Sequence, residues 1–410
     1  MRKEIRPRAR AITWMLTLVY FGSYLMRINF AVMIVKICAD LSLPETDLGI
    51  VLACLTVAYG AGQIASGFLG DRIPPTRMVT LGLLVAVVCN AAMYIPSPVP
   101  VMAAIWTVNG LAHSLLWPPI IRLLSVYITD EEYGYANVRI SWGSSFGTIF
   151  LYLVCPFLLS FLHWRTIILL CAAGGALILL AWVVFSRHLF DTPVREAPML
   201  SRESVAERKK LPPSFFLPVV LTMLAILCQG ILRDGVTNWM PSYMCEAFSL
   251  PEEQAILSTV ILAVFSVVSF AFFSFINERV FRNELRCAFY TFLFATLSAA
   301  TLYFLNFAVS SVILSMLLMA LVVGCMHGIN LMLIAFVPRR FVRYGRVSTV
   351  SGVFNSCTYL GASVSNVLFA AIAAAGSWSD TVLVWVIVAG IGAILCFLSL
   401  PLWRRFYRAE

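Results

Sequence analysis

The chain is built from long apolar stretches joined by short polar connections. An α-helix needs about 20 apolar residues to cross the hydrocarbon core of a bilayer. Stretches of about that length or longer recur along the whole chain, without the period-2 alternation of β-barrel strands. The pattern predicts membrane-spanning helices near residues 11–35, 46–69, 77–95, 98–127, 134–162, 165–187, 215–246, 253–276, 285–306, 310–337, 346–375 and 379–402.

The only long polar segment of the sequence, residues 188–213, divides these twelve helices into six and six. It is rich in charge and proline and ends in Glu207-Arg208-Lys209-Lys210. We therefore predict an N-terminal six-helix bundle at 1–187, a cytoplasmic linker at 188–213 and a C-terminal six-helix bundle at 214–410. The predicted fold class is an all-α membrane protein in two six-helix bundles, a layout typical of transporters.

The composition agrees with this pattern: 61% of the 410 residues are hydrophobic and only 12% are charged. Soluble domains carry about 25% charged residues, so a soluble enzyme or a disordered protein is excluded. The 11 cysteines mostly lie inside apolar stretches without a CxxC pair, and we interpret them as small buried hydrophobic residues. With no metal-ligand spacing, no Ser-His-Asp set and no phosphate-binding glycine loop, we expect no metal, no cofactor and no enzyme activity.

The positive charges indicate the topology. Of the 29 Lys and Arg residues, 25 fall in segments that lie on one side of the membrane if both termini are cytoplasmic. These charges cap apolar segments and form no basic stripe interleaved with aromatic residues, so the net charge of +9 does not indicate nucleic-acid binding. Short loops and the absence of an N-x-S/T sequon favour a multi-pass protein of a bacterial inner membrane, and we expect a monomer in the lipid bilayer.

Two arginines lie deep inside predicted helices. Arg27 is in the first and Arg233 in the seventh, 206 positions apart, and the acid–Arg pairs at Asp71 and Glu278 are offset by a similar 207 positions. An arginine at this depth costs about 2.5–3.5 kcal/mol on insertion scales, so it normally faces a cavity and a partner. Because guanidinium binds phosphate or carboxylate with a bidentate fork, the pair predicts an anion clamp with one arginine from each bundle. The alternatives are that each arginine snorkels to the outer interface or pairs with a buried acid.

Aromatic residues surround the first arginine in the helical pattern. Tyr24 and Tyr20 precede Arg27 by three and seven residues, which places all three on one helix face. Tyr59 in the second helix, with Gln63 one turn further, is expected to line the same cavity. Taken singly, Tyr20 and Tyr24 also fit the pattern of interfacial tyrosine anchors.

Polar residues of the second half give weaker indications. His327 and Asn330 are an i, i+3 pair on one face of the tenth helix and are candidate binding residues. Asp234 directly follows Arg233, and three roles remain open for it: capping a break in the helix, pairing with an arginine, or carrying a proton. Asp71, Arg72 and Arg122, at the ends of the second and fourth helices, are predicted to form a charged latch that acts in gating rather than in substrate contact.

The sequence resembles the organophosphate:phosphate antiporter family of the major facilitator superfamily, which includes glycerol-3-phosphate and hexose-phosphate transporters. The similarity covers most of the chain, and the fourth-helix passage is its most specific part. The passages that carry it are Tyr24-Leu25-Met26-Arg27-Ile28-Asn29-Phe30, Asn109-Gly110 with Trp117-Pro118-Pro119 and Arg122, Arg233-x-Gly235 with Trp239, Pro241 and Tyr243, and Tyr359-Leu360-Gly361.

The resemblance implies alternating-access exchange of an organic phosphate for inorganic phosphate, without a nucleotide. It implies that Arg27 and Arg233 are the phosphate-binding pair, helped by the tyrosines at 20, 24, 59 and 359. The chain departs from the family at Ile28, Gln63 and Ser144, where basic residues are common, so its cavity is less cationic. Two alternatives therefore stay open: proton-coupled symport of an organic carboxylate such as a sugar acid, and a transporter-like sensor of sugar phosphate.

Overall fold

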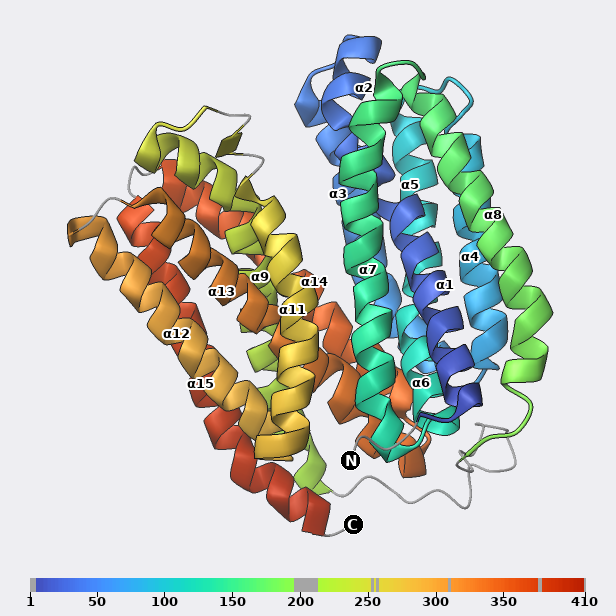
Figure 1. Ribbon diagram of the computed structural model, residues 1–410, viewed down its shortest axis with the longest axis vertical. Helices are drawn as coiled ribbons and strands as arrows, with labels where there is room; N and C mark the ends of the chain where they lie inside the picture. The colour runs from blue at the N-terminus through green and yellow to red at the C-terminus, as the bar shows by residue number, and fades with distance from the viewer. Residues whose placement is uncertain are drawn as a thin grey trace. The chain divides into compact units, whose positions relative to one another are not determined.

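The computed structural model describes residues 5–194, 213–251, 254–255, 258–308, 311–374 and 378–408, and this part of the chain is helical with short connections (Figure 1). Eleven of the helices in this part are long and apolar enough to cross a membrane. A further helix, α14 (Val347–Ala374), has 28 residues and corresponds to the predicted eleventh helix. The end of the predicted linker, including Glu207-Arg208-Lys209-Lys210, lies outside the described residues.

The helices of the first half follow the predicted order. They are α1 (Pro7–Val32), α2 (Ile34–Leu41), α3 (Glu45–Gly70), α4 (Pro75–Ala92), α5 (Val99–Ser114), α6 (Trp117–Tyr127), α7 (Asp130–Leu159) and α8 (Trp164–Leu189). The predicted fourth helix is therefore two pieces, α5 and α6. The interruption falls before Trp117-Pro118-Pro119, because prolines fit the first turn of a helix but lack the N–H that a helix interior needs.

The second half begins with a short turn and continues with the remaining helices. They are η2 (Pro213–Phe215), α9 (Phe216–Phe248), α11 (Val260–Ile276) with η3 (Asn277–Phe281), α12 (Glu284–Ala308), α13 (Val312–Asn330) with η4 (Leu331–Phe336) and η5 (Val337–Tyr344), α14, and α15 (Trp378–Arg408). The elements η3 and η4 are π-helical and η5 is a 3₁₀ helix, so two of the predicted helices end in non-α turns.

Contacts divide the chain into two compact units. One comprises Met1–Lys209 with Pro338–Ser356, and the other comprises Lys210–Val337 with Cys357–Glu410. The segment 338–356 thus packs within the first unit although it follows the linker by more than a hundred residues. The bundle boundaries expected from the polar segment stay a prediction.

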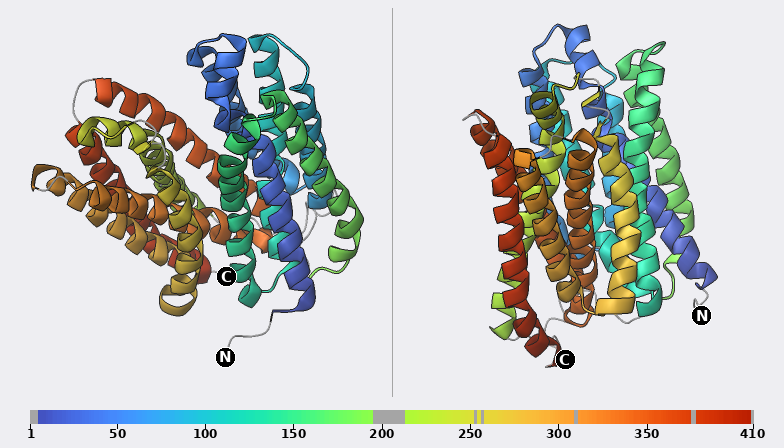
Figure 2. Two further views of the ribbon diagram at one scale, coloured as in Figure 1. Left: turned by 45° about the horizontal axis from the view of Figure 1, so that its top comes forward. Right: turned by 60° about the vertical axis from the view of Figure 1, so that its left-hand side comes forward.

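Four helix pairs recur in the two units. In the first, α3 packs on α5, α4 packs on α5 and α8, and α8 packs on α1. In the second, α11 packs on α13, α12 packs on α13 and α15, and α15 packs on α9. Counted along each half, these are the same four pairs, and the views in Figures 1 and 2 show the helices of each unit running alongside one another. Equivalent packing in chain order is what two parallel repeats predict.

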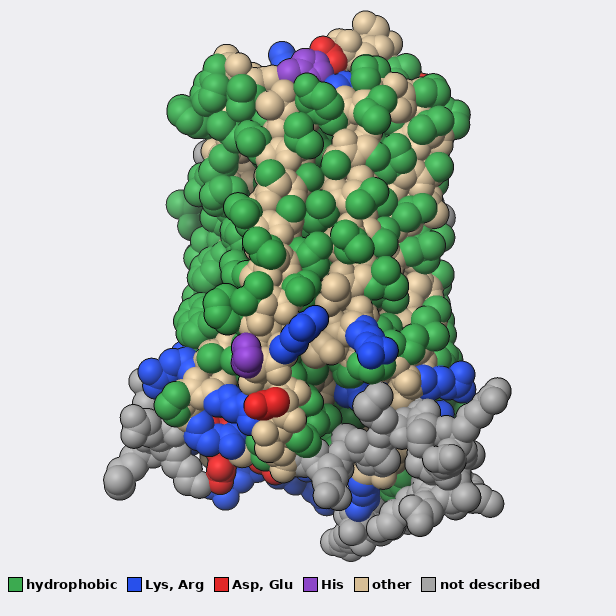
Figure 3. Space-filling model, turned by 90° about the vertical axis from the view of Figure 1, so that its right-hand side faces the viewer, with side chains coloured by type: hydrophobic (Ala, Val, Ile, Leu, Met, Phe, Trp, Pro, Cys, Tyr) green, Lys and Arg blue, Asp and Glu red, His purple; other side chains and the backbone are tan. Residues whose placement is uncertain are grey.

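The outer surface is apolar over the middle of the helices. Figure 3 shows one face, on which hydrophobic side chains cover most of the height while Lys and Arg gather mainly toward one end. On α8, Leu177 and Leu180 are 70% and 60% exposed. Side chains of this kind are stable only where the surrounding medium is hydrocarbon, so this distribution is typical of a protein embedded in a bilayer.

Buried amide side chains join three helices of the first unit. Asn29 on α1 donates to Asn90 Oδ1 on α4 at 2.8 Å. The carbonyl of Met26 accepts from Nδ2 of Asn90 at 2.9 Å and from Nδ2 of Asn109, on α5, at 3.0 Å. The N–H of Phe30 donates to Asn29 Oδ1 at 2.8 Å. All three asparagines are fully buried, so these bonds fix α1 between its neighbours where no water can replace them.

A similar arrangement joins three helices of the second unit. Gln229 on α9 donates from Nε2 to the carbonyl of Met326 on α13 at 3.1 Å. Thr358 on α14 donates from its hydroxyl to Gln229 Oε1 at 3.2 Å. Beside this bond, a Cβ at Gly230 would meet the carbonyl of Thr358, and one at Gly361 would meet that of Leu227. Glycine is needed at both positions because it lets the backbones of α9 and α14 approach closely.

Replacing Asn90 tests how much the asparagine network, formed by Asn29, Asn90 and Asn109, contributes to stability. We expect Asn90→Ala to lower the free energy of unfolding by about 1–2 kcal/mol, because the bonds that Asn90 makes to α1 are lost inside an apolar environment. The measurement is denaturant-induced unfolding of the full chain in detergent micelles.

The control is Thr107→Ala, since Thr107 donates only within its own helix, to the carbonyl of Ala103 at 2.8 Å. We expect this change to stay within about 0.5 kcal/mol. Equal losses in the two variants would contradict a special contribution from the asparagine network.

Candidate functional site

The first arginine lies among aromatic rings. The Cζ atom of Arg27, on α1, is 4.2 Å from the ring centroid of Tyr24 and 4.8 Å from that of Tyr59 on α3. The ring of Tyr20 packs edge-on against Tyr24, with centroids 5.3 Å apart. The structure thus brings together the arginine and the three tyrosines that were predicted around it. Cation–π contact stabilises a desolvated guanidinium by about 2 kcal/mol.

Gln63 lies one turn beyond Tyr59 on α3 and is fully buried. Neither its amide oxygen nor its amide nitrogen has a hydrogen-bond partner in the part of the chain that the structure describes. A buried amide without a hydrogen-bond partner lowers the free energy of unfolding by about 1–3 kcal/mol. Its backbone carbonyl faces α14 closely, since a Cβ added at Gly352 would meet this oxygen. Gln63 therefore offers a buried polar group on a part of α3 whose backbone α14 approaches closely.

The second arginine is held by the residue that follows it. Arg233, on α9, donates from Nε to Asp234 Oδ1 at 2.6 Å and from Nη2 to Asp234 Oδ2 at 3.1 Å. Its Cζ atom also lies 5.7 Å from the ring centroid of Tyr359 on α14. Helix α9 continues without a break from Phe216 to Phe248. The idea that Asp234 caps a helix break is therefore wrong, and the ion pair is the arrangement present.

His327 and Asn330 differ in their surroundings. His327 on α13 packs edge-on against Phe270, with ring centroids 5.3 Å apart, and it interacts electrostatically with Arg233 and Asp234. Asn330 is half-buried at the end of α13, and its side chain forms no hydrogen bond with any other described residue. His327 therefore interacts with Arg233 on α9, whereas Asn330 shows no such interaction with the described residues.

The hydrogen-bonded amide side chains of both units lie next to these candidate residues. Their role in joining helices was not predicted from the sequence. The bonded carbonyl of Met26 directly precedes Arg27, and Thr358 directly precedes Tyr359. Gln229 lies one helical turn before Arg233. The signal was present in the sequence, because asparagine and glutamine inside apolar helices usually bond to neighbouring helices. Which helices they join could not be deduced.

His113, on α5, is also structural in this arrangement. Its Nδ1 is 2.8 Å from the carbonyl oxygen of Asn109, and its Nε2 is 2.8 Å from that of Ser23 on α1. The side chain is 2% exposed. The ring therefore links α5 to α1 in the same layer as the asparagine network.

A buried carboxylate lies at the end of α3. Asp71 accepts from the backbone N–H of Ser348 at Oδ1 and from that of Thr349 at Oδ2, both at 2.9 Å. These are orphan N–H groups of the first turn of α14, so Asp71 caps that helix and faces its positive end. Arg122 donates to the carbonyl of Gly70, and its Nη1 lies 3.9 Å from Asp71 Oδ1.

The surroundings of Asp71 act on its ionisation in both directions. Burial raises the pKa of the Asp71 carboxyl above its usual value, while the hydrogen bonds from Thr349 and Ser348 and the charge of Arg122 oppose that rise. Arg72 is exposed and forms no ion pair with another described residue. Of the three residues predicted for the latch, Asp71 and Arg122 are therefore close together, and Arg72 is exposed.

The segment before α14 is attached to the first unit by a second charged contact. Arg339, in η5, pairs with Asp130 at the start of α7, and its Cζ atom lies 4.2 Å from the ring centroid of Tyr133. Together with the cap at Asp71, this contact explains why 338–356 packs with the N-terminal helices rather than with the rest of the C-terminal half.

Removing the charge of the cap tests its strength. We expect Asp71→Asn to speed amide hydrogen exchange at Ser348 and Thr349 by about tenfold, because one amide oxygen replaces two charged acceptors and a helix cap contributes about 0.5–2 kcal/mol. Exchange followed by mass spectrometry on peptides that cover 347–356 measures this. Asp47→Asn, at the opposite end of α3, is the control and is expected to leave exchange there unchanged. Equal exchange in Asp71→Asn and the unmodified protein would show that the cap does not hold α14.

Comparisons with known proteins agree with this architecture. Residues 16–366 match the family model described as Major Facilitator Superfamily. A glycerol-3-phosphate transporter of Bacillus subtilis is 23% identical over 95% of this chain and 91% of its own. A probable hexose phosphate transport protein of Chlamydia trachomatis is 27% identical over 33% of this chain and 29% of its own. A probable sulfoacetate transporter, SauU, of Cupriavidus necator is 22% identical over 74% and 73%.

Solved structures show the same fold. The crystal structure of the transporter FucP in the outward conformation superposes with a TM-score of 0.73 at 11% identity, covering 96% of this chain and 99% of that one. An outward-facing bacterial homologue of the iron transporter ferroportin gives 0.70 at 13% identity, covering 98% and 100%. Since the family model matches most of its length, this chain belongs to the Major Facilitator Superfamily and is a transporter rather than an enzyme, resembling the organophosphate:phosphate antiporters.

Proposed function

We propose that this transporter carries a small organic anion by alternating access, and that the anion is an organic phosphate ester exchanged for inorganic phosphate. The observation that supports this is one arginine inside a long membrane-spanning helix in each half. Arg233 is 17 residues from Phe216 and 15 from Phe248 along α9. Arg27 is 20 residues from Pro7 and five from Val32 along α1, and the short helix α2 follows it. Permanently charged groups at such depth are costly unless they serve a ligand or a partner.

The contacts of Arg27 favour an oxyanion ligand. The rings of Tyr24 and Tyr59 lie within 5 Å of its Cζ atom. A guanidinium that is stacked on rings directs its N–H donors sideways, in the plane where a phosphate or carboxylate accepts two parallel hydrogen bonds. Tyr59 and Tyr20 carry phenol groups that can donate to the same oxyanion. The proposed binding residues are therefore Arg27 and Arg233 with Tyr20, Tyr24, Tyr59, Gln63, Tyr359, His327 and Asn330.

The relatives support the same substrate class. The named substrates of the B. subtilis and C. trachomatis proteins, glycerol-3-phosphate and hexose phosphate, are phosphate esters, and sulfoacetate is a small organic anion. What these molecules share is an oxyanion on a small carbon skeleton. We infer the same class here, with Asp71, Arg72 and Arg122 acting in gating. The charge distribution favours cytoplasmic termini. The short loops and the absence of an N-x-S/T sequon favour a bacterial inner membrane.

A second candidate function is proton-coupled symport of an organic carboxylate, and the Arg233–Asp234 pair favours it. The carboxylate of Asp234 accepts from Nε and Nη2 of Arg233 at 2.6 and 3.1 Å, so it fills one bidentate edge of the guanidinium and compensates its charge. An anion therefore gains the full charge and all the donors of Arg233 only when Asp234 is displaced or neutral. A proton on Asp234 would release the guanidinium, which links anion binding to proton uptake.

Substituting each arginine tests the clamp. We expect Arg27→Ala and Arg233→Ala each to weaken phosphate binding by about 100-fold, since a charge-assisted bidentate contact contributes up to about 3 kcal/mol. Arg→Lys at either position should also be poor, because an ammonium group cannot form the fork. Phosphate counterflow measures this: proteoliposomes are loaded with labelled phosphate, and its release is followed when glycerol-3-phosphate, hexose phosphates or sugar acids are added outside.

The matched control is Arg187→Ala, an exposed arginine near the end of α8 that should leave counterflow unchanged. Unchanged affinity in Arg27→Ala or Arg233→Ala would overturn the clamp. Release that depends on pH and on a carboxylate, without phosphate exchange, would favour the second candidate. Binding without flux of any substrate would favour a sensor.

The Arg233–Asp234 ion pair predicts that a substitution of Asp234 strengthens anion binding, whereas the arginine substitutions weaken it. We expect Asp234→Asn to strengthen anion binding by about three- to tenfold at neutral pH, because the competing carboxylate is removed from a partly buried pair. Isothermal titration calorimetry with phosphate at neutral pH measures this. Weaker binding in Asp234→Asn would show that Asp234 positions Arg233 instead of competing for it.

A further inference from the structure

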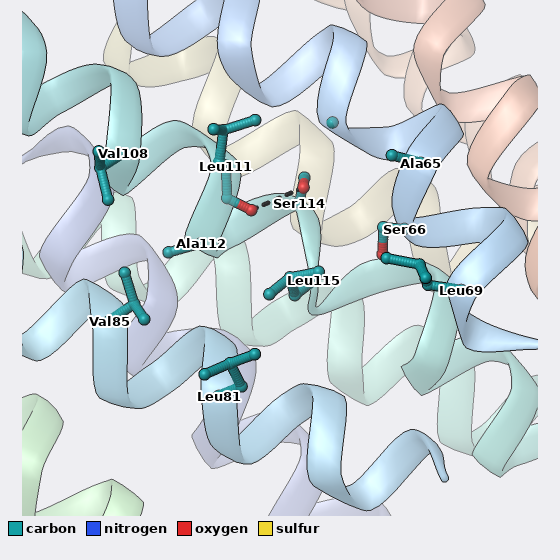
Figure 4. Close-up of a pocket in the computed structure, with 11 residues that line it drawn as sticks. Ala65, Ser66, Leu69, Leu81, Val85, Val108, Leu111, Ala112, Ser114 and Leu115 are labelled. Carbon is teal, nitrogen blue, oxygen red and sulfur yellow. Dashed lines mark hydrogen bonds between the residues drawn. The ribbon is translucent and has the colours of Figure 1, made fainter. Parts of the chain in front are cut away.

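A groove lies on the membrane-facing side of the first unit, where α3, α4 and α5 meet (Figure 4). Its volume is about 220 Å³, and its lining is almost entirely apolar. Three of its side chains are half-exposed although they lie on membrane-spanning helices: Leu81 at 51%, Val108 at 46% and Leu111 at 46%. The groove therefore opens toward the surrounding lipid.

Hydrocarbon must occupy such a groove in a bilayer. A void forfeits the dispersion contacts of its walls, and protein interiors avoid voids for this reason. Lipid tails are as apolar as leucine, so no hydrophobic driving force distinguishes one acyl chain from another. Any selectivity must come from polar or charged groups at the end of the groove.

Two arginines provide such groups. Arg77 begins a stripe on α4 that continues with Leu81 and Val85 at spacings of four residues, so it lies on the face that lines the groove. Arg72 follows the lining residue Leu69 by three positions, in the connection between α3 and α4. Both arginines are exposed, and within the described parts of the chain neither has an ion-pair partner.

Asp71, the acid next to Arg72 in the chain, does not cancel these charges. Asp71 is 1% exposed, and both of its oxygens accept backbone N–H groups of α14. The end of the groove therefore presents two exposed positive charges beside an apolar channel. Each basic residue near a membrane surface attracts an anionic lipid by about 1 kcal/mol.

A polar group inside the groove has no partner. Ser66 lines it, is fully buried, and its hydroxyl forms no hydrogen bond with any described residue. Ser114, on the opposite wall, donates to the carbonyl of Leu111 at 2.7 Å, as Figure 4 shows. Ser66 lies six residues before Arg72, or about 9 Å along a helix. An ester carbonyl of a phospholipid sits at this depth, between its phosphate and its acyl chain, and can accept the Ser66 hydroxyl.

We propose that this groove binds one anionic phospholipid. Its phosphate lies against Arg72 and Arg77, its ester carbonyl accepts from Ser66, and one acyl chain fills the channel between α3, α4 and α5. The assignment is independent of the transported substrate, since none of these residues belongs to the proposed anion clamp.

Native mass spectrometry of the full-length protein tests the proposal, with phosphatidylglycerol and phosphatidylcholine of identical acyl chains as probes. We expect one phosphatidylglycerol to be retained at least about tenfold more strongly than phosphatidylcholine. Arg72→Gln with Arg77→Gln should weaken phosphatidylglycerol by about fivefold for each arginine and leave phosphatidylcholine unchanged. Leu111→Trp, which fills the groove, should weaken both lipids.

Matched controls lie on another membrane-facing helix. Arg187→Gln and Leu180→Trp on α8 change an exposed arginine and an exposed leucine away from the groove, and we expect wild-type retention in both. Equal retention of the two lipids by the unmodified protein would overturn the proposal. Wild-type retention in Leu111→Trp would also overturn it, because the lipid would then be bound by the surface charges alone. Displacement of phosphatidylglycerol by inorganic phosphate would overturn it as well, because that result would indicate a site for free anions.

Discussion

A guanidinium group inside a membrane-spanning helix has to be supported by its surroundings, and much of this structure follows from that requirement. Arg27 is surrounded by tyrosine rings, and the turn that carries it is tied to α4 and α5 through Asn90 and Asn109. Arg233 lies one turn from Gln229, which bonds to α13 and α14. Because no water reaches these amides, each bond also fixes the helix that bears the charge.

The carboxylates of Asp71 and Asp234 make different kinds of contact. Asp71 binds backbone N–H groups at the start of α14 and thereby joins a late segment of the chain to the first unit. Asp234 binds the side chain of Arg233 and fills one bidentate edge of its guanidinium. The first contact stabilises one arrangement of helices. The second places a negative charge directly beside the arginine of the second unit.

The sequence predicted the order and approximate limits of the helices, because a span is a local property of about 20 apolar residues. It also placed Arg27 beside Tyr24, since residues three apart share a helix face. It did not predict the division of the fourth helix into α5 and α6, nor the π-helical and 3₁₀ turns after α13. It left three roles open for Asp234, and only the continuous course of α9 removed one of them.

The sequence by itself determined that the protein is an all-α membrane protein, which charged residues lie inside its apolar helices, and which family it resembles. Apolar length, charge placement and local motifs carry that information along the chain. The tertiary structure decided the partners: Asp71 with the first turn of α14, Arg339 with Asp130, and Gln229 with Thr358. These pairs are separated by more than a hundred residues, and helix periodicity specifies which face a side chain occupies but not which distant helix meets that face.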